Sequence, residues 1–376
     1  MAKRYAHVTG WGMAAPDRIL TNDDLARMVD TTDDWILSRT GISERHIAEK
    51  GETTATLAEN AALRALESTD ITAKDLDLII VATSTPEYIF PSTACIVQDQ
   101  IGATHAGAFD LSAACTGFIY AINMAAQAIR TGSIENALVI GAETLSLFTN
   151  WEDRNTCVLF GDGAGAFVLQ ASDRPGGVLT CIMRSDGSGA NLLSLPAGGS
   201  KLPTTHETVD KKQHTIQMKG REVFRFATRV MASATREAVS LAEWALDDVT
   251  WVIPHQANMR IIEAAARGLR MPLEKFVINL SRYGNTSTAS IPIAACEALQ
   301  SGRIQDGDNL VLVGFGSGLT WGALTLKWVS PERKISRAAR RRRAFLMLLA
   351  RMRSFVRRLI RKIEGLIWGT SSGDQR

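Results

Sequence analysis

Cys115 stands where a protein would place a nucleophilic sulfur. It lies in the segment LSAACTG (residues 111–117), after an apolar stretch and just before a run of small and apolar residues with helical period (117–129). At the start of a helix, unpaired backbone N–H groups and the helix dipole stabilise a thiolate and lower the pKa of the thiol. This placement predicts a thiol that attacks an electrophilic carbon without a dedicated base. The alternative is a cysteine that only fills space, because Cys is a common small buried residue.

Two other residues that could do chemistry, His255 and Asn285, lie in the second half of the chain. His255 is in IPHQAN (253–258), at the end of an apolar strand pattern, and Asn285 is in the loop YGNTSTAS (283–290). α/β proteins place reactive groups where strands end and helices begin. Taken alone, each residue is a weak signal, since a single histidine is usually structural and an asparagine in a Gly/Ser/Thr loop usually serves a turn.

The elements that must position these residues follow an α/β pattern, in which short β-rich runs alternate with longer stretches of helical period. The two halves also resemble each other, because three strand-end segments recur in the same order at offsets of 172, 169 and 173 residues. The matched pairs are 78–84 (LIIVATS) with 250–256 (TWVIPHQ), 110–112 (DLS) with 279–281 (NLS), and 135–141 (ENALVIG) with 308–314 (DNLVLVG). This recurrence predicts a duplicated α/β unit, against the alternative that short apolar strands resemble one another by chance.

The 376-residue chain has the composition of a globular protein, with 45 % hydrophobic and 22 % charged residues. Its five cysteines are odd in number and lack CxxC spacing, which argues against a disulfide framework and a zinc site and favours the reducing cytoplasm. The N-terminal segment lacks the apolar run of a signal peptide. Two glycine-rich segments, GDGAG (161–165) and GFGSG (314–318), run into further strand patterns rather than helices, so a dinucleotide cofactor is not expected.

From Lys3 to Trp328 the chain resembles, in unbroken order, the β-ketoacyl-ACP (acyl carrier protein) synthase III family, whose active site is a Cys-His-Asn triad. The segments that carry the resemblance are DWILSRTG (34–41), the Cys115 segment, FGDGAG (160–165), the His255 and Asn285 segments, and GSGLTWG (316–322). The resemblance implies the thiolase fold, with two α/β halves in a five-layered αβαβα arrangement, and a homodimer. It places the nucleophile in an N-terminal half (1–172) and the His and Asn in a C-terminal half (173–330), followed by an extension (331–376).

The same resemblance implies a two-step acyl transfer. Cys115 would take the acyl group from an acyl-CoA, while the backbone N–H groups of Cys115 and Ser317 receive the oxyanion. Malonyl-ACP would then lose CO₂, and His255 and Asn285 would donate hydrogen bonds to the enolate oxygen, so that neither a cofactor nor a metal is required. The GFGSG turn lacks the second cysteine that a thiolase uses as base, and Asn285 replaces the second histidine of elongating synthases. Plant-type polyketide synthases share the triad but lack the surrounding segments.

Further binding residues are implied by the resemblance alone. Trp35 and Arg39 would bind the adenine end of CoA through a stacking face and a positive charge, against the alternative that Trp35 is a core aromatic. The residues implied along the pantetheine channel are Arg154, Met218, Gly220, Phe224 and Asn258. Arg225 and Arg260 would dock the acidic carrier protein. Local positive charge is needed there because residues 1–330 carry 28 Lys and Arg against 36 Asp and Glu, a net charge of −8.

Phe90, in YIFPS (88–92), matches a position that the family projects across the dimer interface to close the partner's acyl pocket. A rigid ring at the end of a pocket rejects longer chains, since overpacking costs ~1–3 kcal/mol. We therefore predict a short acyl donor such as acetyl-CoA, against the alternative that Phe90 only packs the interface.

The extension beyond the resemblance is strongly basic, with 14 Lys and Arg against 3 Asp and Glu in residues 331–376. Its apolar residues recur at helical spacing between basic ones, and its longest apolar run (344–350) is too short to cross a bilayer. After an Arg-rich stretch (333–343), residues 344–368 are therefore predicted to form a basic amphipathic helix. Residues 333–368 are predicted to lie on an anionic membrane, at the inner face. The alternatives are binding of the acidic carrier protein or of the enzyme's own acidic body and, least favoured and not expected, binding of nucleic acid.

Three functions are compatible with these features. The preferred one is initiation of fatty acid synthesis from a short acyl-CoA in the cytoplasm. The second keeps the chemistry but condenses other acyl chains in secondary metabolism. The third is a non-catalytic, membrane-associated binding protein, which would leave a complete triad and oxyanion turn idle.

Overall fold

Two mixed β-sheets form the framework of the computed structural model, which describes residues 3–330 and positions 352, 354, 356, 357, 359, 360, 362 and 363. The first sheet has the strand order β1-β7-β6-β4-β5, and the second has the order β11-β12-β13-β8. The strands of the first sheet are β1 (Tyr5–Ala14), β4 (Leu78–Ala82), β5 (Gly107–Leu111), β6 (Asn136–Thr144) and β7 (Asp162–Ser172). Those of the second are β8 (Gly177–Ser185), β11 (Trp251–Pro254), β12 (Asn309–Gly316) and β13 (Thr320–Lys327).

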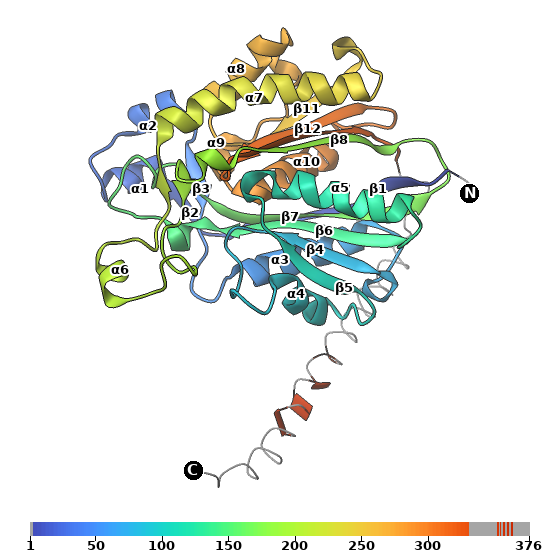
Figure 1. The fold of residues 1–376 in the computed structure, drawn as a ribbon, viewed down its shortest axis with the longest axis horizontal. Coiled ribbons are helices and arrows are strands. Elements are labelled where there is room, and N and C mark those ends of the chain that lie inside the picture. The colour runs from blue at the N-terminus through green and yellow to red at the C-terminus, as the bar shows by residue number, and fades with distance from the viewer. Residues whose placement is uncertain are drawn as a thin grey trace.

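Helices cover the outer face of each sheet and fill the space between the sheets (Figure 1). α3 and α4 pack on the outer face of the first sheet, α5 and α10 lie between the sheets, and α7 and α8 cover the outer face of the second. Their bounds are α3 (Thr54–Ser68), α4 (Thr93–Ile101), α5 (Gly117–Arg130), α7 (Gly220–Leu241), α8 (Met259–Leu269) and α10 (Ser290–Gln300). The predicted five-layered αβαβα arrangement is thereby confirmed.

The strand β12 shows how one apolar run serves two helical layers. Leu310 and Leu312 face the central helices, whereas Val311 and Val313 face α7 and α8. Successive side chains of a strand point to opposite faces, and both faces are buried here, so the sequence NLVLVGFG is continuously apolar rather than alternating.

The strand connections of the two sheets repeat each other, as the recurring segments predicted. β4 and β6 are parallel, and β6–β7 and β7–β1 are antiparallel. In the same order, β11 and β12 are parallel, and β12–β13 and β13–β8 are antiparallel. The matched sequence segments fall on the equivalent strands β4 and β11, and β6 and β12. The first sheet uses residues 5–172 and the second uses residues 177–327, and the division into domains at residue 172 stays a prediction.

Two groups of short elements interrupt this repeated pattern. Those that follow β1 are β2 (Ile19–Thr21), α1 (Asn22–Ala26), α2 (Asp33–Thr40) and β3 (Glu44–His46). Those that follow β8 are β9 (Leu193–Ser194), α6 (His206–Asp210) and β10 (Gln217–Met218), and the short α9 (Leu280–Tyr283) precedes α10. Both groups lie at the same end of the molecule, on the left in Figure 1, where several of the predicted binding residues are found.

The described positions of the C-terminal extension are helical. Ser354 is buried, and its hydroxyl donates to the Asp99 backbone oxygen at 2.7 Å and to the Asp99 carboxylate, near the end of α4. The apolar residues that are about half exposed are Met352, Val356, Leu359, Ile360 and Ile363. No described helix is long and apolar enough to span a bilayer. The rest of the predicted amphipathic helix lies outside the described residues.

Candidate active site

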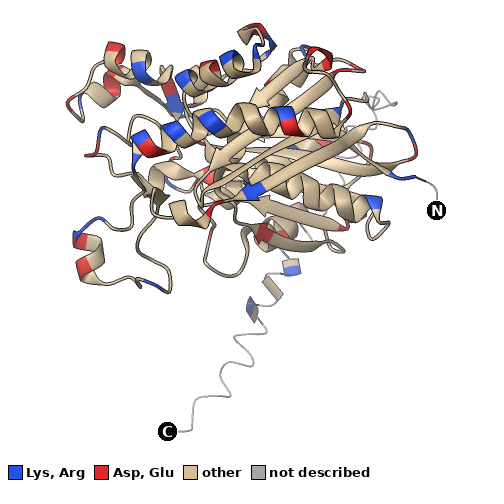
Figure 2. Cartoon of the chain, turned by 45° about the horizontal axis from the view of Figure 1, so that its top comes forward, with Lys and Arg blue, Asp and Glu red and all other residues tan. Residues whose placement is uncertain are grey.

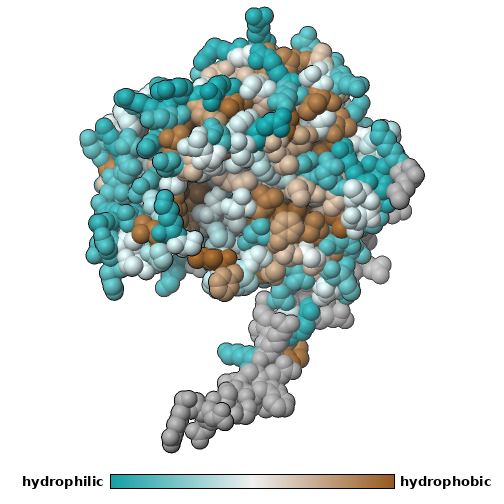
Figure 3. Space-filling model, viewed as in Figure 1, coloured by the Kyte–Doolittle hydropathy of each residue, from teal (hydrophilic) through white to brown (hydrophobic). Residues whose placement is uncertain are grey.

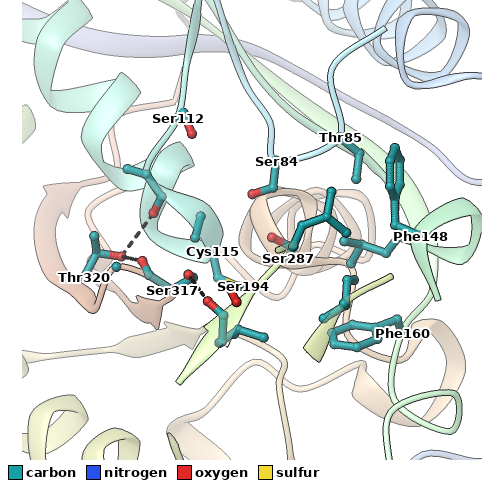
Figure 4. A pocket seen from close by; sticks show the side chains of 17 residues that line it. Ser84, Thr85, Ser112, Cys115, Phe148, Phe160, Ser194, Ser287, Ser317 and Thr320 are labelled. Atoms are coloured by element: carbon teal, nitrogen blue, oxygen red, sulfur yellow. Dashed lines mark hydrogen bonds between the residues drawn. The ribbon is translucent and has the colours of Figure 1, made fainter. Parts of the chain in front are cut away.

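Cys115 lines a cavity of about 380 Å³ to which both halves of the protein contribute (Figure 4). It occupies a short 3₁₀ turn (Ala114–Thr116) that leads from β5 into α5, so it lies at the beginning of a helix, where the sequence placed it. The preceding residue Ala114 has a φ of 47°. This left-handed conformation costs a residue with a Cβ about 1–3 kcal/mol and is found most often at functional sites.

The second half supplies an equivalent turn that meets the first at the sulfur. Residues Ser287–Ala289 form a 3₁₀ turn leading into α10, and Ser287 has a φ of 46°. Ala114 and Ser287 are 173 residues apart, which is one of the offsets of the duplication. Ser287 and Cys115 line the same cavity, and the Ser287 side chain acts to lower the pKa of the Cys115 thiol. Ser287 was not predicted from the sequence, although the duplication offset maps its turn onto the Cys115 turn.

Two glycines of β12 place Cys115 and His255 side by side. A Cβ on Gly316 would lie only 2.7 Å from the backbone nitrogen of Cys115 and 3.3 Å from its Cβ, so only glycine permits this approach. A Cβ on Gly314 would lie 3.5 Å from the Cβ of His255. Positions 314 and 316 share one face of the strand about 7 Å apart. Cys115 and His255 are therefore neighbours along β12.

Hydroxyl groups connect the Cys115 turn to the glycine-rich turn (Figure 4). The Thr320 hydroxyl lies 3.1 Å from the carbonyl oxygens of both Ala113 and Ser317, and 2.9 Å from the Thr116 hydroxyl. The Ser317 hydroxyl donates to the backbone oxygen of Leu193 in β9. These bonds hold the backbone of Ser317 next to the nucleophile turn, which is the arrangement that the predicted oxyanion role requires.

His255 follows the last residue of β11 and is held from several sides. Its backbone N–H donates to Val313 at 2.8 Å, its ring packs edge-on against Phe315 with centroids 5.3 Å apart, and its Nδ1 lies 2.7 Å from the Ser290 hydroxyl. The side chain is 1 % exposed. This burial lowers the pKa of His255 to about 3, so the imidazole is neutral at physiological pH.

Asn285 is buried like His255, and neither residue lines the cavity. The backbone of Asn285 pairs with the segment around Phe160, donating to Leu159 at 2.8 Å and accepting from Gly161 at 3.1 Å. Its side-chain oxygen accepts a bond of 2.9 Å from the Ser287 backbone N–H. The oxygen is therefore occupied, and the NH₂ group is the part of the amide that remains to act as a donor.

The protonation of Cys115 differs from the expectation based on helix position. Burial raises the pKa of the Cys115 thiol to about 12, the nearby Glu143 carboxyl adds to the increase, and the hydrogen bond from Ser287 opposes it. Burial therefore works against the thiolate that the helix position favours, and the expected lowering of the pKa of this thiol is not found. The resting group is a neutral thiol, and its proton needs an acceptor when the sulfur attacks.

Glu143, at the end of β6, is a functional-site residue that the sequence analysis missed. It is fully buried and accepts bonds from the Thr85 hydroxyl at 2.6 Å, the Ser84 N–H at 3.1 Å and the Thr288 hydroxyl at 3.1 Å. Burial raises the pKa of its carboxyl, and these donors limit the increase. A lone acidic residue in the apolar segment NALVIGAET was the available signal. Glu143 fixes the loops on both sides of Cys115.

The residues predicted for the adenine end of CoA form one cluster. The guanidinium carbons of Arg39 and Arg154 lie 4.5 and 5.1 Å from the centre of the Trp35 ring. Asn258, the N-cap of α8, donates to the Arg39 carbonyl at 3.0 Å, and Arg260 donates to the Ser38 carbonyl at 2.7 Å. An adenine that stacks on Trp35 must share the ring with these two guanidinium groups.

The other predicted residues lie on two further segments. Met218 in β10 pairs with Leu193, which lines the cavity, and Gly220 is the first residue of α7. Phe224 and Arg225 are exposed one turn further along the same helix. Phe90 is not brought to the cavity of its own chain and is 84 % exposed. Among the described residues, no group of three or more His, Cys, Asp or Glu side chains is arranged to hold a metal ion.

Comparison with known proteins gives consistent matches. The profile of the family 3-Oxoacyl-[acyl-carrier-protein (ACP)] synthase III matches residues 109–190, and that of its C-terminal part matches residues 239–328. A Beta-ketoacyl-[acyl-carrier-protein] synthase III of Desulfitobacterium hafniense (strain Y51) is 54 % identical over 321 residues, covering 85 % of this chain and 97 % of that protein. The crystal structures of 3-oxoacyl-[acyl-carrier-protein] synthase III from Aquifex aeolicus VF5 and Pseudomonas aeruginosa PAO1 are 46 % and 39 % identical, with TM-scores of 0.80 and 0.81. They cover 86 % and 88 % of this chain and 100 % of each of those chains.

The lowered pKa of His255 predicts a measurable loss of stability in mild acid. Unfolded histidine binds a proton below pH 6.5, whereas folded His255 stays neutral down to about pH 3. The unfolded state therefore takes up more protons in this window, and stability falls as the pH is lowered. Between pH 7 and pH 5 the loss from this group is about 2 kcal/mol. Urea denaturation of the wild type and of His255→Gln at both pH values should show a smaller pH-dependent loss in the variant, and equal losses would contradict the assignment.

Proposed function

Because the chain belongs to the β-ketoacyl-[acyl-carrier-protein] synthase III family, we propose that it condenses an acyl group from acyl-CoA with malonyl-ACP, giving 3-oxoacyl-ACP, CO₂ and CoA. It is an acyltransferase, and its reaction is the initiating condensation of fatty acid synthesis. Three turns meet at Cys115, and this arrangement is the main support for the proposed function. They are the turn of Cys115 itself, the turn at Ser287 and the glycine-rich turn at Ser317. The reaction proposed here uses no cofactor.

In the first step the Cys115 sulfur attacks the thioester carbonyl of acyl-CoA. The new S–C bond forms, the carbonyl electron pair moves onto oxygen, and the CoA sulfur then departs as that pair returns. The backbone N–H groups of Cys115 and Ser317 would stabilise the oxyanion, and the close approach at Gly316 supports this role. The thiol proton passes through the neutral His255 to the departing CoA sulfur, so that acyl-enzyme and free CoA are formed.

In the second step malonyl-ACP loses CO₂ and the electron pair of the broken C–C bond becomes an enolate. Asn285, with its NH₂ group available, and His255 are the proposed hydrogen-bond partners of the enolate oxygen. The enolate carbon attacks the acyl-enzyme carbonyl, and the Cys115 sulfur departs as a thiolate that takes up one proton from solvent. Burial of the triad supports this assignment, because hydrogen bonds are stronger where water is excluded.

Binding of both substrates is proposed for the end of the molecule that carries Trp35 and the start of α7. The cluster around Trp35 supports binding of CoA, with Arg39 and Arg154 supplying charge. Met218, Gly220 and Phe224 would border the pantetheine arm. Lys and Arg positions recur along α7, the long helix in front in Figure 2. We infer that Arg225 on this helix, with Arg260 on α8, docks the acidic carrier protein.

A homodimer is supported by an apolar, unpaired edge. β5 is the last strand of its sheet and has no partner on its outer side among the described strands. Apolar atoms gather on the face over α5 in Figure 3. The large exposed apolar residues on β5, α5 and the loop after β4 are Phe109, Met124, Tyr88, Ile89 and Phe90. A second copy of this chain would cover these groups, pair the open edge and bring Phe90 to its partner's acyl pocket.

We also propose that the enzyme works in the cytoplasm and binds the inner membrane face through its extension. The described apolar side chains of the extension are about half exposed, and Arg357 and Lys362 lie beside them. This combination matches the apolar and basic faces of a helix lying on anionic lipid.

Loss of the nucleophile tests the proposed function directly. Replacing Cys115 by Ala removes the only atom that would carry the acyl group, so the protein should retain no label from radioactive acetyl-CoA and should form no 3-oxoacyl-ACP. Replacing the exposed Cys95 by Ala should leave both the acetyl labelling and the formation of 3-oxoacyl-ACP unchanged. Labelled acetyl retained on Cys115→Ala would refute the assignment.

The size of Phe90 predicts the acyl preference. Substituting the smaller Thr for Phe90 should raise the use of octanoyl-CoA relative to acetyl-CoA by roughly ten- to a hundred-fold, which corresponds to the removal of ~1–3 kcal/mol of overpacking. The same change at the exposed Leu147 serves as the control. A native preference for decanoyl-CoA over acetyl-CoA would contradict this prediction.

The extension should determine membrane binding but not catalysis. A chain ending at Ser330 should stay active yet lose co-flotation with vesicles that contain anionic lipid, and binding of the full chain should weaken as salt is raised. Exchanging Val356 and Leu359 for Ser should weaken binding without changing the charge. Equal flotation of the full and shortened chains would show that the extension is not the membrane anchor.

A further inference from the structure

The C-terminal extension contacts the body through a polar side chain. Ser354 is fully buried, and its hydroxyl lies 2.7 Å from the Asp99 backbone oxygen and also contacts the Asp99 carboxylate. Asp99 belongs to the last turn of α4, which packs on the outer face of the first sheet. The extension is therefore attached to the outermost layer of the first half, and Figure 1 shows its described positions leading away from the body on this side.

The apolar residues of the extension face away from this contact. Since a helix turns by about 100° per residue, the position of each side chain around the axis can be compared with that of Ser354. The described apolar residues all lie at about 120° to 180° from Ser354 on this scale. They form an apolar stripe, and each is about half exposed: Met352, Val356, Leu359, Ile360 and Ile363. The polar side of the helix thus contacts the body, and the apolar stripe is directed outward.

Arg357 and Lys362 lie at the two borders of the apolar stripe. They fall about 60° and 80° from Ser354, in opposite directions around the helix axis, and both are exposed. A stripe with a basic residue at each border is typical of a helix in the plane of an anionic bilayer, because long basic side chains reach the head groups while the stripe enters the acyl region. Residues 331–376 carry 14 Lys and Arg against 3 Asp and Glu, so the extension supplies the attraction to anionic lipid that the acidic body lacks.

The proposed docking site of the carrier protein lies on the opposite outer layer. α7 and α8 cover the outer face of the second sheet, whereas α3 and α4 cover that of the first. Arg225 is exposed on α7. Two sheets and the central helices separate these outer layers, which places them about 40 Å apart at ~10 Å for each layer.

We propose that the extension holds the enzyme on anionic lipid with the end of α4 toward the bilayer and α7 away from it, so that the bound enzyme still accepts its carrier protein. The inference rests on the proposed membrane binding and on the proposed docking at Arg225. The helix of the extension lies between lipid and body, with the apolar stripe on the lipid and Ser354 on α4. A body joined to the helix without this contact would take many orientations.

Fluorescent labels at two exposed positions measure this orientation in the full-length protein. Thr104→Cys, just after α4, and Ser233→Cys, on α7, each introduce one exposed cysteine after Cys95 and Cys115 have been replaced by Ala. With vesicles that contain anionic lipid and a head-group quencher, the label at position 104 should be quenched several-fold more than the label at position 233. Because Cys115 is replaced, this result does not depend on catalysis.

Ser354→Gln tests the contact with α4 without changing the charge. The larger side chain overfills a fully buried position, so it should separate the helix from α4. The variant should still float with the vesicles, because the apolar stripe is intact, but the two labels should be quenched about equally. The same change at the exposed Ser240 of α7 should keep the unequal quenching of the parent protein. Unequal quenching that persists in Ser354→Gln would show that this contact does not orient the body.

Activity on vesicles tests the consequence for the reaction. The wild-type enzyme should form 3-oxoacyl-ACP at the same rate with and without saturating vesicles. Loss of this product on vesicles, with acetyl transfer from acetyl-CoA retained, would mean that lipid covers the carrier-protein face, and the proposed orientation would be wrong. An enzyme inactive in solution would contradict the proposed condensation, whereas the two labels would still decide the orientation.

The remaining outcomes separate orientation from membrane binding. Flotation with equal quenching of both labels, or with stronger quenching at position 233, would refute the orientation and leave membrane binding intact. Absence of flotation would refute both. If the full chain without lipid forms a larger oligomer than a chain ending at Ser330, a second copy covers the apolar stripe and the proposal is wrong.

Discussion

The site depends on the approach of the β12 backbone to the backbone of Cys115. Any side chain at Gly316 would collide with the Cys115 nitrogen, so the contact exists only because this strand position carries no Cβ. The close packing places the nucleophile turn next to Ser317, and Gly314, one pleat earlier, accommodates His255. One strand of the second sheet thereby sets the positions of Cys115, His255 and the glycine-rich turn at Ser317. The strained backbone at Ala114 is held by the same contact.

Duplication of the α/β unit explains how such a site could be assembled. Each half contributes a strained turn before a central helix, and the two turns face each other across the centre of the molecule. In the first half this turn carries Cys115, whereas the second half carries hydroxyl groups at Ser287 and Ser290. Two copies of one backbone geometry thus supply different chemistry. The proposed nucleophile comes from one copy, and His255, Ser287 and Ser290 come from the other.

Burial affects the protonation of both Cys115 and His255. Desolvation disfavours the thiolate of Cys115 and the imidazolium of His255 in the resting protein, which raises the pKa of the first and lowers that of the second. Both groups are neutral, and the Ser290 hydroxyl lies 2.7 Å from the His255 Nδ1. Charge therefore develops only during the reaction, where fixed N–H and O–H donors meet it. Glu143 belongs to the same buried network, with donors that fix its carboxyl in place.

The sequence by itself determined the layers and the duplication, and it singled out the Cys115 loop as the proposed nucleophile. These features are local or periodic: apolar runs form buried strands, helical period forms helices, and the recurring strand ends reveal the repeat. The expected cluster of Trp35, Arg39, Arg154, Asn258 and Arg260 also came from matched segments, and the structure brings those residues together. Only the tertiary structure decided the protonation of Cys115 and the parts played by Glu143, Ser287 and Ser290. Each depends on burial or on contact between residues more than twenty positions apart, and neither quantity is contained in a residue's sequence neighbourhood.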